Sequence, residues 1–264
     1  FYYYNEYKII LLRFINYIII FFLINCGSKS IDIEEDLLLR FNKAKIFFDT
    51  EKYSRAKDEF DYIIRIDPGS KLSNESQYYK GEALFYLKEY DEAWVTLDRF
   101  VRFSNDIKKI ELSRYRMCEC AIFASNPYQR DQTETIKALN QLQLFIEDFP
   151  DSELLPKAEK SIIELRYKLA KKEFEAGRIY LKLDEYESAL LYFKSVLNNY
   201  YDTNFADEAR INIIFTHILN DNRWGAINYL ETEKDRFLSI DKHNEAESLI
   251  KETADGLKMT HYYK

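Results

Sequence analysis

The stretch GRIYLKLDEYESALLYFKSVLNNYY, residues 177–201, contains the spacing that decides the fold. A small residue, Gly177, opens it, and Tyr186 follows nine positions later. Ala189 comes three positions after the tyrosine, and Phe193 four positions after the alanine. Residues four apart lie on one face of a helix, so the alanine and the phenylalanine share a face. The stretch therefore predicts two helices joined by a short turn, in close contact where the glycine of the first meets the alanine of the second.

Four more segments repeat this spacing along the chain. Two copies are strong, AKIFFDTEKYSRAKDEFDYIIRIDP at 44–68 and GEALFYLKEYDEAWVTLDRFVRFSN at 81–105, and two weaker copies centre on Ala138 and Ala226. The spacing resembles the tetratricopeptide repeat, a helix–turn–helix unit of 34 residues whose stacked copies bury a continuous core. The fold is therefore expected to be all-α, an α-solenoid of about five tetratricopeptide helix pairs. The residues expected at the close helix crossings are Ala44, Ala56, Gly81, Ala93, Ala138, Gly177, Ala189 and Ala226.

The third repeat departs from the regular spacing. Its first helix is expected at Leu112–Ala124, and the stretch SNPYQRDQTE separates this helix from the second. One long predicted helix, ELLPKAEKSIIELRYKLAKKEFEAGRIYLKL at 153–183, follows the repeat. Ordered insertions are often functional, so Arg130 and Asp131 are candidate site residues. Capping of the next helix by Asp131 or Thr133 explains the insertion equally well.

The N-terminal sequence resembles a bacterial lipoprotein signal. In NYIIIFFLINCGSKS, residues 16–30, a short apolar run ends at Cys26, and basic residues precede the run. The run is shorter than the about 20 apolar residues that span a bilayer, and this arrangement is typical of a secretory signal. LINC resembles the lipobox, and Gly27 follows the cysteine where an inner-membrane lipoprotein has Asp. We expect a signal peptide at residues 1–25, followed by the lipidated cysteine and a tether at 26–35. An uncleaved anchor helix is the alternative.

Composition and charge exclude several functional classes. The 264 residues carry a net charge of −7, which argues against nucleic acid as a partner, and the 6 glycines and 4 prolines argue against an all-β fold. His217, His243 and His261 lack metal-ligand spacing, and the chain has no HExxH, GxSxG or glycine-rich phosphate loop. Cys118 and Cys120 face opposite sides of a helix and are expected to be buried free thiols. We expect no enzymatic activity, no cofactor and no metal.

Local matches connect the chain with a known family. LDRFVRFSNDIKKIELSRYRMCECAIF, residues 97–123, resembles the segment DRFIRLNP of the BamD family, the tetratricopeptide lipoproteins of the outer-membrane β-barrel assembly machinery. The insertion with adjacent Arg and Asp, the sequence FPDS at 149–152 and the helix IIELRYKLAKKEF at 162–174 then follow in the family's order. The resemblance covers residues 36 to about 217, whereas the last 40 residues match nothing in the family.

The resemblance implies an outer-membrane lipoprotein on the periplasmic face, anchored by lipid on Cys26. It implies that the N-terminal half, residues 36–125, receives the C-terminal segments of unfolded outer-membrane proteins. The C-terminal half, residues 126–235, would dock on the periplasmic domains of the barrel-forming core subunit. Residues 236–264 are expected to form a C-terminal helix or tail. Where the family has a basic docking residue this sequence has Phe193, which predicts an apolar contact.

Such a substrate peptide ends in an aromatic side chain and a free carboxylate, which aromatic and arginine side chains recognise. The expected groove residues are Tyr79, Phe85, Tyr86, Trp94, Arg99, Arg102 and Arg114. Core packing is the alternative for Phe85 and Trp94, and simple solvation is the alternative for Arg99 and Arg102.

Two other functions fit parts of the sequence. One is a different periplasmic tetratricopeptide lipoprotein that scaffolds protein partners in cell-wall coordination or nutrient binding. The other is a lipid-anchored enzyme, which requires a polar constellation that the motifs above do not supply. The ordered match over residues 97–174 favours an assembly factor.

Overall fold

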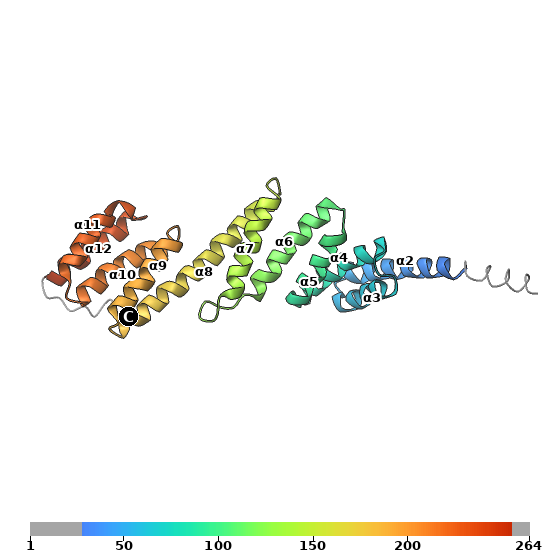
Figure 1. Cartoon of the computed structure of the whole chain (residues 1–264), viewed down its shortest axis with the longest axis horizontal. Helices are drawn as coiled ribbons and strands as arrows, with labels where there is room; N and C mark the ends of the chain where they lie inside the picture. The colour runs from blue at the N-terminus through green and yellow to red at the C-terminus, as the bar shows by residue number, and fades with distance from the viewer. Residues whose placement is uncertain (1–27, 255–264) are drawn as a thin grey trace, which may run out of the picture. The chain divides into compact units, whose positions relative to one another are not determined.

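The computed structural model describes the backbone of residues 28–254 and the side chains of residues 34–253, and every element in this range is helical (Figure 1). The elements are α2 (Ser28–Asp49), α3 (Tyr53–Ile66), α4 (Lys71–Tyr86), α5 (Tyr90–Phe103), α6 (Ile107–Ala124), α7 (Thr133–Asp148), α8 (Leu155–Lys182), α9 (Tyr186–Asn199), α10 (Phe205–Leu219), α11 (Arg223–Glu233), η1 (Lys234–Arg236) and α12 (Ile240–Ala254). Helices α2 to α11 form five pairs in sequence, so the predicted all-α tetratricopeptide fold is confirmed. The expected signal peptide, Cys26 and residues 255–264 of the tail lie outside the described residues.

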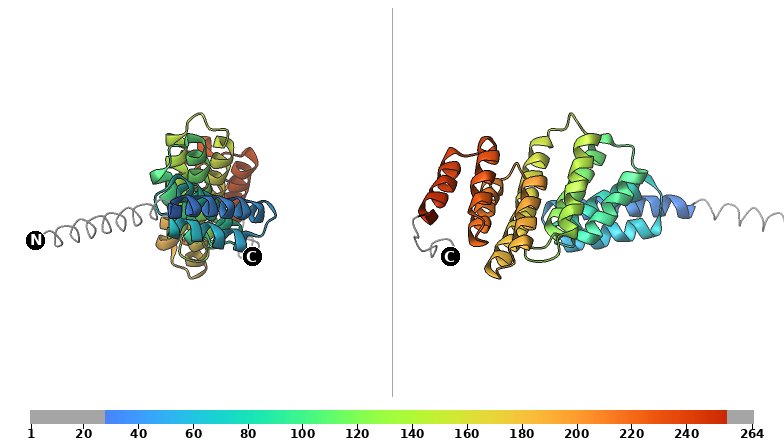
Figure 2. Two further views of the ribbon diagram at one scale, coloured as in Figure 1. Left: turned by 90° about the vertical axis from the view of Figure 1, so that its right-hand side faces the viewer. Right: turned by 60° about the vertical axis from the view of Figure 1, so that its left-hand side comes forward.

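The chain divides into two compact units between Cys120 and Ala121, inside α6. In the first unit, α2 packs on α3 and α4, and α4 packs on α3 and α5 (Figure 2). In the second, α8 packs on α7, α9 and α10, and α10 packs on α9, α11 and α12. In each unit, the two helices of a pair contact each other, and the first helices of successive pairs also contact each other. Stacked repeats bury their apolar faces through these two kinds of contact.

The alanines at the helix crossings lie in the cores. Ala44 and Ala56 pack with Phe60 in the first unit, and Ala189 packs with Phe193 in the second. A larger side chain at these positions would have to push two helices apart. The alanines predicted at the crossings all have 0 % exposed surface: Ala44, Ala56, Ala93, Ala138, Ala189 and Ala226.

Two glycines bring the helices of their pairs close together. A Cβ at Gly177 would lie 2.6 Å from the ring of Phe193, and one at Gly81 would lie 2.5 Å from Cδ2 of Leu97. The atoms nearest to each glycine thus belong to the large residue of the second helix, rather than to its alanine as the spacing suggested. Phe193 has 0 % exposed surface, so the expectation that it forms an apolar docking contact is wrong. Its ring fills the space that the glycine leaves.

Four of the pairs close with the same turn, which explains the regular spacing. The residues in the left-handed region, with φ between 53° and 64°, are Glu51, Lys88, Asp184 and Asp221. The next residue donates its N–H to a carbonyl five positions back, as Glu89 does to Leu84 at 3.0 Å. This is the Schellman pattern that ends helices. The repeat alanine then makes the first bond of the second helix, as Ala93 N does to Glu89 O at 2.9 Å.

Candidate functional site

An open groove of about 1130 Å³ lies in the first unit where the α3–α4 turn and the connection that follows α5 meet. Its walls are the α3–α4 turn, the first two turns of α4, and the end of α5 with Arg99 and Phe103. Gly69 in the turn has a φ of 89°, and Ser70 caps α4 by accepting a hydrogen bond from Ser73 N at 3.0 Å. The N-terminus of α4, where the helix dipole is positive, therefore forms part of the groove wall.

A second surface of the first unit is aromatic. The ring of Tyr79 lies 5.7 Å from that of Phe48 and 5.6 Å from that of Phe60, and Tyr86 stacks on Tyr53 at 4.6 Å. Aromatic pairs of this kind add about 0.5–1.5 kcal/mol beyond the area that they bury. These rings join α2, α3 and α4, so much of their contact area serves packing between helices.

A guanidinium covers part of the aromatic surface. Arg116 of α6 lies 4.2 Å over the ring of Phe85 and 5.6 Å over that of Tyr86. It donates two hydrogen bonds of 3.0 Å to the carboxylate of Glu82 and one of 2.6 Å to Glu119. Burial acts to lower the pKa of Arg116, but the bonds to Glu82 and the two negative charges raise it above its ordinary value. The charge of Arg116 is therefore already matched within the protein.

The residues predicted to line one groove lie in separate places. Arg99 lines the groove, whereas Tyr79, Phe85 and Tyr86 belong to the aromatic surface. Trp94 is partly buried and packs against a core cluster of the first unit, as does Phe85. The aromatic and basic side chains chosen from the sequence are thus not brought together as a set.

The three predicted arginines have different surroundings. Arg99 makes no ion pair with any residue that the structure describes, whereas the Nε of Arg102 donates to Asp98 at 2.7 Å on the exposed side of α5. Arg114 is half-buried on α6. Arg116, which the sequence reasoning missed, is the arginine on the aromatic surface. Residues two apart point about 200° apart on a helix, so the choice between them depends on the rotational phase of α6.

Polar residues of α4 in the groove wall were also missed. Ser73, Asn74 and Gln77 all line the groove. Their spacing of one, three and four places them on one side of the helix, directly after the Pro-Gly-Ser turn. That spacing could have predicted a polar wall on this helix. Polar residues are common in the first turns of helices, however, so the spacing alone does not indicate a site.

Lysines of α8 hold the insertion, residues 125–132. The ammonium group of Lys168 donates to the hydroxyl of Ser125 at 2.6 Å, and that of Lys172 donates to the carbonyl oxygen of Arg130 at 2.7 Å. The side chain of Arg130 is exposed. Its main chain therefore contributes to the attachment of the loop.

Asp131 caps the helix that follows the insertion. Its carboxylate accepts a hydrogen bond from Thr133 N at 3.0 Å, and the bonds to Thr133 hold the pKa of this carboxyl below its ordinary value. The buried amide of Gln132 donates to the carbonyl oxygens of Pro127 at 2.8 Å and Arg130 at 3.0 Å. These contacts agree with the capping alternative for the insertion.

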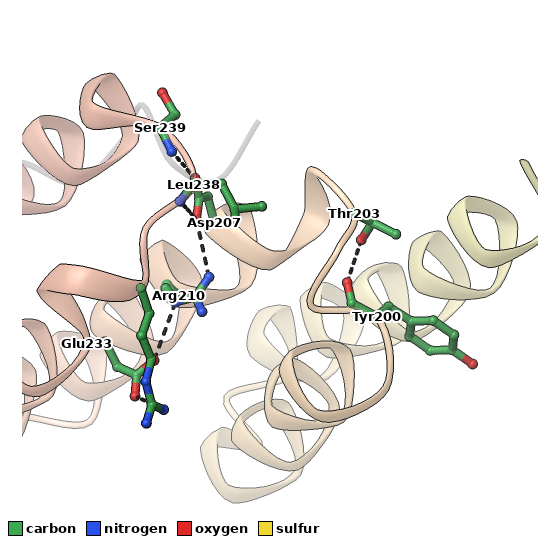
Figure 3. Close-up of polar contacts among 8 residues, drawn as sticks. Tyr200, Thr203, Asp207, Arg210, Glu233, Leu238 and Ser239 are labelled. Atoms are coloured by element: carbon green, nitrogen blue, oxygen red, sulfur yellow. Dashed lines mark hydrogen bonds and ion pairs between the residues drawn. The ribbon is translucent and has the colours of Figure 1, made fainter. Parts of the chain in front are cut away.

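The second unit contains a buried charged cluster (Figure 3). Arg210 donates to Asp207 at 3.2 Å and to Glu233 at 3.4 Å. Asp207 also accepts the backbone N–H groups of Leu238 at 3.0 Å and Ser239 at 2.8 Å. Leu238 and Ser239 directly precede α12, so the cluster ties α10 to the start of that helix. Each charged member has a partner, which offsets the cost of burying it.

Other chemistry-bearing groups lack the features of a reactive site. Cys118 and Cys120 are buried free thiols, as predicted, and burial raises the pKa of each to about 12. Within the described part of the chain, no group of three or more His, Cys, Asp or Glu side chains has the geometry to hold a metal ion. Over the same residues, no helix combines the length and the apolar character needed to cross a membrane.

The helix pairs and their shared turn define a tetratricopeptide-repeat protein. The sequence model of one family, "YfiO: Outer membrane lipoprotein", matches residues 39–219, which is more than half of the chain. The chain belongs to this family of outer membrane lipoproteins, as the local matches predicted.

Curated relatives carry one name, "Outer membrane protein assembly factor BamD". The relative from Rickettsia prowazekii is 26% identical over 196 residues, which cover 74% of this chain and 78% of the relative. The relative from Caulobacter vibrioides is 27% identical over 170 residues, which cover 64% and 56%. Among solved structures, MamA from Desulfovibrio magneticus RS-1 is similar with a TM-score of 0.35 at 14% identity, covering 76% of this chain and 94% of that chain.

Proposed function

We propose that this chain is an outer membrane protein assembly factor, a non-catalytic lipoprotein that scaffolds the β-barrel assembly machinery and receives unfolded outer-membrane proteins. The observation that carries the proposal is the family match, which extends from α2 to the end of α10. The name borne by the curated relatives supports it. Stacked tetratricopeptide helices are suited to binding segments of other proteins.

The proposed location is the periplasmic face of the outer membrane, with lipid on Cys26 as the anchor. Two or more acyl chains hold a protein stably at a membrane, whereas one holds it only marginally. Cys26→Ser should therefore move the chain from the membrane to the soluble fraction of broken cells, as measured by immunoblotting of the two fractions. Recovery of the variant entirely in the membrane would contradict the anchor.

The first unit is the proposed receiver of substrate. Its groove combines Arg99, which is unpaired among the described residues, with the exposed ring of Phe103. A basic group beside an apolar one suits a peptide that ends in an aromatic side chain and a carboxylate.

The second unit is the proposed docking unit for the periplasmic domains of the barrel-forming core subunit. Ile179 of α8 and Leu183, the C-cap residue of that helix, lie one turn apart, and both are more than half exposed. Leu191 on α9 is 69 % exposed and adjoins Tyr192, whose ring stacks on Tyr180 of α8 at 5.2 Å. Exposed apolar groups of this kind mark contact surfaces. They replace the buried Phe193 as the proposed apolar contact.

Affinity purification of the tagged chain from detergent-solubilised membranes, followed by mass spectrometry, tests this function. The barrel-forming core subunit should co-purify, and Leu191→Glu should reduce its recovery at least tenfold. The control Ile136→Glu changes an exposed apolar residue of α7 and should leave recovery unchanged. Because the contact is apolar, recovery should vary little with salt concentration. Recovery of cell-wall enzymes or nutrient-binding proteins without the core subunit would replace the proposal by the alternative scaffold.

A further inference from the structure

One side of α2 carries a row of exposed apolar side chains. Leu39 and Ile46, about two turns apart, are 64 % and 62 % exposed, and Leu38 beside them is 51 % exposed. The opposite side of the helix, with Leu37 and Ala44, is buried against α3 and α4. Single exposed apolar residues are normal in proteins, but a row of them along one helix side marks a contact surface.

The row begins close to the proposed anchor. Helix α2 starts at Ser28, two residues after Cys26, so it takes up most of the segment 26–35 expected as a tether. A helix rises about 1.5 Å per residue, which places Leu39 about 17 Å and Ile46 about 27 Å along the axis from Ser28. A flexible tether lets the first unit move away from the membrane, whereas a helix keeps the row at a set distance from an acyl chain on the cysteine.

Two orientations of α2 at the membrane follow from this distance. A helix standing upright on Cys26 carries Ile46 about 30 Å from the bilayer surface and leaves the apolar row in water. A helix lying along the surface buries the row in the headgroup region, where amphipathic helices sink by about 5–10 Å. Gly27, the one residue between the cysteine and the helix, is the residue type whose backbone turns most freely. The flat orientation is therefore sterically open, and it is the one that removes the row from water.

Charge does not select the partner of this side of α2. The charged residues at its edges pair within the protein, Lys43 with Glu59 at 2.7 Å and Asp49 with Lys45 at 3.9 Å. Glu35, on the same side nearer the N-terminus, makes no ion pair with any residue that the structure describes. A layer of anionic headgroups therefore gains nothing from charge, and the burial of the apolar row is the driving force.

The small size of the row favours a membrane over a protein partner. Three apolar side chains, with the neutral Asn42 among them, cover far less than the about 1,200 Å² that a stable protein interface buries. A contact of this size is weak by itself, but an anchor two residues before the helix makes it intramolecular, at a high effective concentration. A lipid surface is the partner that this anchor brings to the helix.

We propose that α2 lies along the membrane with Leu38, Leu39 and Ile46 in the headgroup region, as a second attachment beside the lipid on Cys26. This inference rests on the proposed anchor and goes beyond the proposed function, which requires only that the chain is attached. The contact gives the first unit a fixed orientation, with α2 between the bilayer and helices α3 and α4.

Fluorescence quenching by spin-labelled lipid tests the contact in the full-length chain. The lipidated protein is reconstituted into vesicles of phosphatidylethanolamine and phosphatidylglycerol, in which part of the lipid carries a nitroxide near the headgroup end of one acyl chain. An environment-sensitive dye is attached to Leu39→Cys, to Ile46→Cys or to Val95→Cys, an exposed apolar site on α5. Cys118 and Cys120 are buried, so the dye reacts with the introduced cysteine.

The position of the dye decides the expected result. A dye at position 39 or 46 should lose about half of its fluorescence in the spin-labelled vesicles, because both positions lie at the depth of an interfacial helix. A dye at position 95 should keep its fluorescence. Quenching at 39 and 46 should be the same in vesicles of phosphatidylcholine alone, because the contact depends on apolar burial rather than on charge.

A double substitution separates the helix contact from the anchor. Leu39→Gln with Ile46→Gln should reduce the quenching of a dye at Asn42→Cys at least about threefold, because less apolar surface is left to bury, while the lipid keeps the chain on the vesicles. Ile66→Gln with Val95→Gln changes two other exposed apolar residues of the first unit, so it is the matched control and should leave quenching unchanged. Circular dichroism checks that each variant is folded.

Four results would overturn the proposal. A chain that floats with the vesicles but shows no quenching at 39 and 46 stands off the membrane, which removes the contact and leaves the anchor intact. Equal quenching at 39, 46 and 95 would show that the dye itself enters the bilayer. Quenching that falls as the protein is packed more densely would show that a second copy covers this side of α2. A chain that does not float would contradict the lipid on Cys26 and the contact together, whereas co-purification of the core subunit tests the assembly role separately.

Discussion

Two sets of buried polar side chains, one in each unit, differ in how fully they are hydrogen-bonded. In the second unit, Arg210 bonds to Asp207 and Glu233, and Asp207 also accepts two backbone N–H groups, so the charged cluster is internally matched. In the first unit, Asn74 and Gln77 in the groove wall leave side-chain oxygens without partners among the described residues. The same helix-pair fold thus carries one polar set that is complete and one that is incomplete.

The difference separates a structural role from a binding role. A matched buried cluster specifies one arrangement of its helices, here α10 with the start of α12, and offers nothing to a ligand. An unmatched cluster beside a groove costs stability until something bonds to it. The comparison predicts that changes in the charged cluster of the second unit reduce stability, whereas changes of the unpartnered side chains in the groove reduce binding and leave stability equal or higher.

Arg210→Met should have the largest effect. It leaves Asp207 buried without its cation, whereas Glu233 keeps its bond from Arg236 at 2.9 Å, and breaking a buried pair in this way costs about 3–5 kcal/mol. Urea unfolding followed by circular dichroism measures the loss, and hydrogen exchange should localise it to α10–α12. The control Lys160→Met breaks an exposed pair with Glu164 and should change the free energy of unfolding by about 0.5 kcal/mol or less.

A second substitution sharpens this test. Glu233→Leu added to Arg210→Met removes a buried carboxylate whose remaining partner is the exposed Arg236, and Asp207 keeps its bonds to the backbone of Leu238 and Ser239. The double variant should therefore recover part of the loss. A double variant that is less stable than Arg210→Met would show that the cluster stabilises through packing rather than through charge.

Substitution of one glycine in each unit should give the next largest difference in the free energy of unfolding. Gly177→Ala places a methyl group against the rigid ring of Phe193, and overpacking of this kind costs about 1–3 kcal/mol. Gly81→Ala meets Cδ2 and Cγ of the buried Leu97 at 2.5 Å and 2.6 Å, so the whole side chain has to shift, but this branched chain is smaller and less rigid than a ring. Chemical unfolding of both variants should show a larger loss for Gly177→Ala than for Gly81→Ala. Equal losses would mean that the flexibility of the facing side chain does not matter.

The fold could be predicted from the sequence because the tetratricopeptide spacing reflects local geometry. The interval from Gly177 to Ala189 fixes two helices and the turn between them. The sequence does not show, however, that the ring of Phe193, one turn after the alanine, supplies the atoms nearest to the glycine. The left-handed turn residue was not predicted either. Lys88 and Asp184 occupy a position where glycine is the usual signal.

Much less of the candidate site could be predicted. Arg99 lines the groove, but the choice between Arg114 and Arg116 needed the rotational phase of α6. Whether a polar group is paired depends on residues far away in sequence, as with Glu82 and Arg116, which are 34 positions apart. Composition and spacing do not show which polar groups are paired. The sequence therefore does not distinguish Gln77 from any other polar residue near the start of a helix.

A smaller effect of opposite sign is expected in the groove. Ser73→Ala removes a buried hydroxyl that has no partner among the described residues, so the free energy of unfolding should rise by up to about 1 kcal/mol. Thr135→Val is the matched control, because that buried hydroxyl donates to Gln132 at 2.8 Å, and its loss should cost about 1 kcal/mol. Chemical unfolding of the two variants decides the matter. A loss of stability at Ser73 would indicate that its hydroxyl is bonded in solution.

The smallest effect concerns a surface pair of the second unit. The hydrogen bond from Arg166 holds the pKa of Asp202 below its ordinary value, with Nε–Oδ2 at 3.0 Å. A carboxyl whose pKa is lower in the folded state stabilises the fold above its unfolded pKa of about 3.9, and this contribution is lost as pH falls through the folded pKa. Asp202 is 44 % exposed, so solvent screening limits the contribution to about 1 kcal/mol or less.

Unfolding of the native chain and Asp202→Asn between pH 6 and pH 3 measures this contribution. The native chain should be slightly more stable at pH 6, and the difference should shrink toward pH 3. A difference that stays constant over this range would mean that Asp202 contributes to the free energy of unfolding through the geometry of its hydrogen bonds and not through its charge.

The rate at which the buried thiols of α6 react with an alkylating reagent measures how often this helix opens. With a pKa of about 12, Cys118 and Cys120 are thiolates in only about one molecule in 10⁴ at pH 8, and their sulfur atoms are covered. An alkylating reagent therefore reacts with them only when the helix separates from its neighbours. Cys120 packs against Leu84 of α4 and Ala93 of α5, so the rate of alkylation reports how often α6 separates from these helices within the first unit.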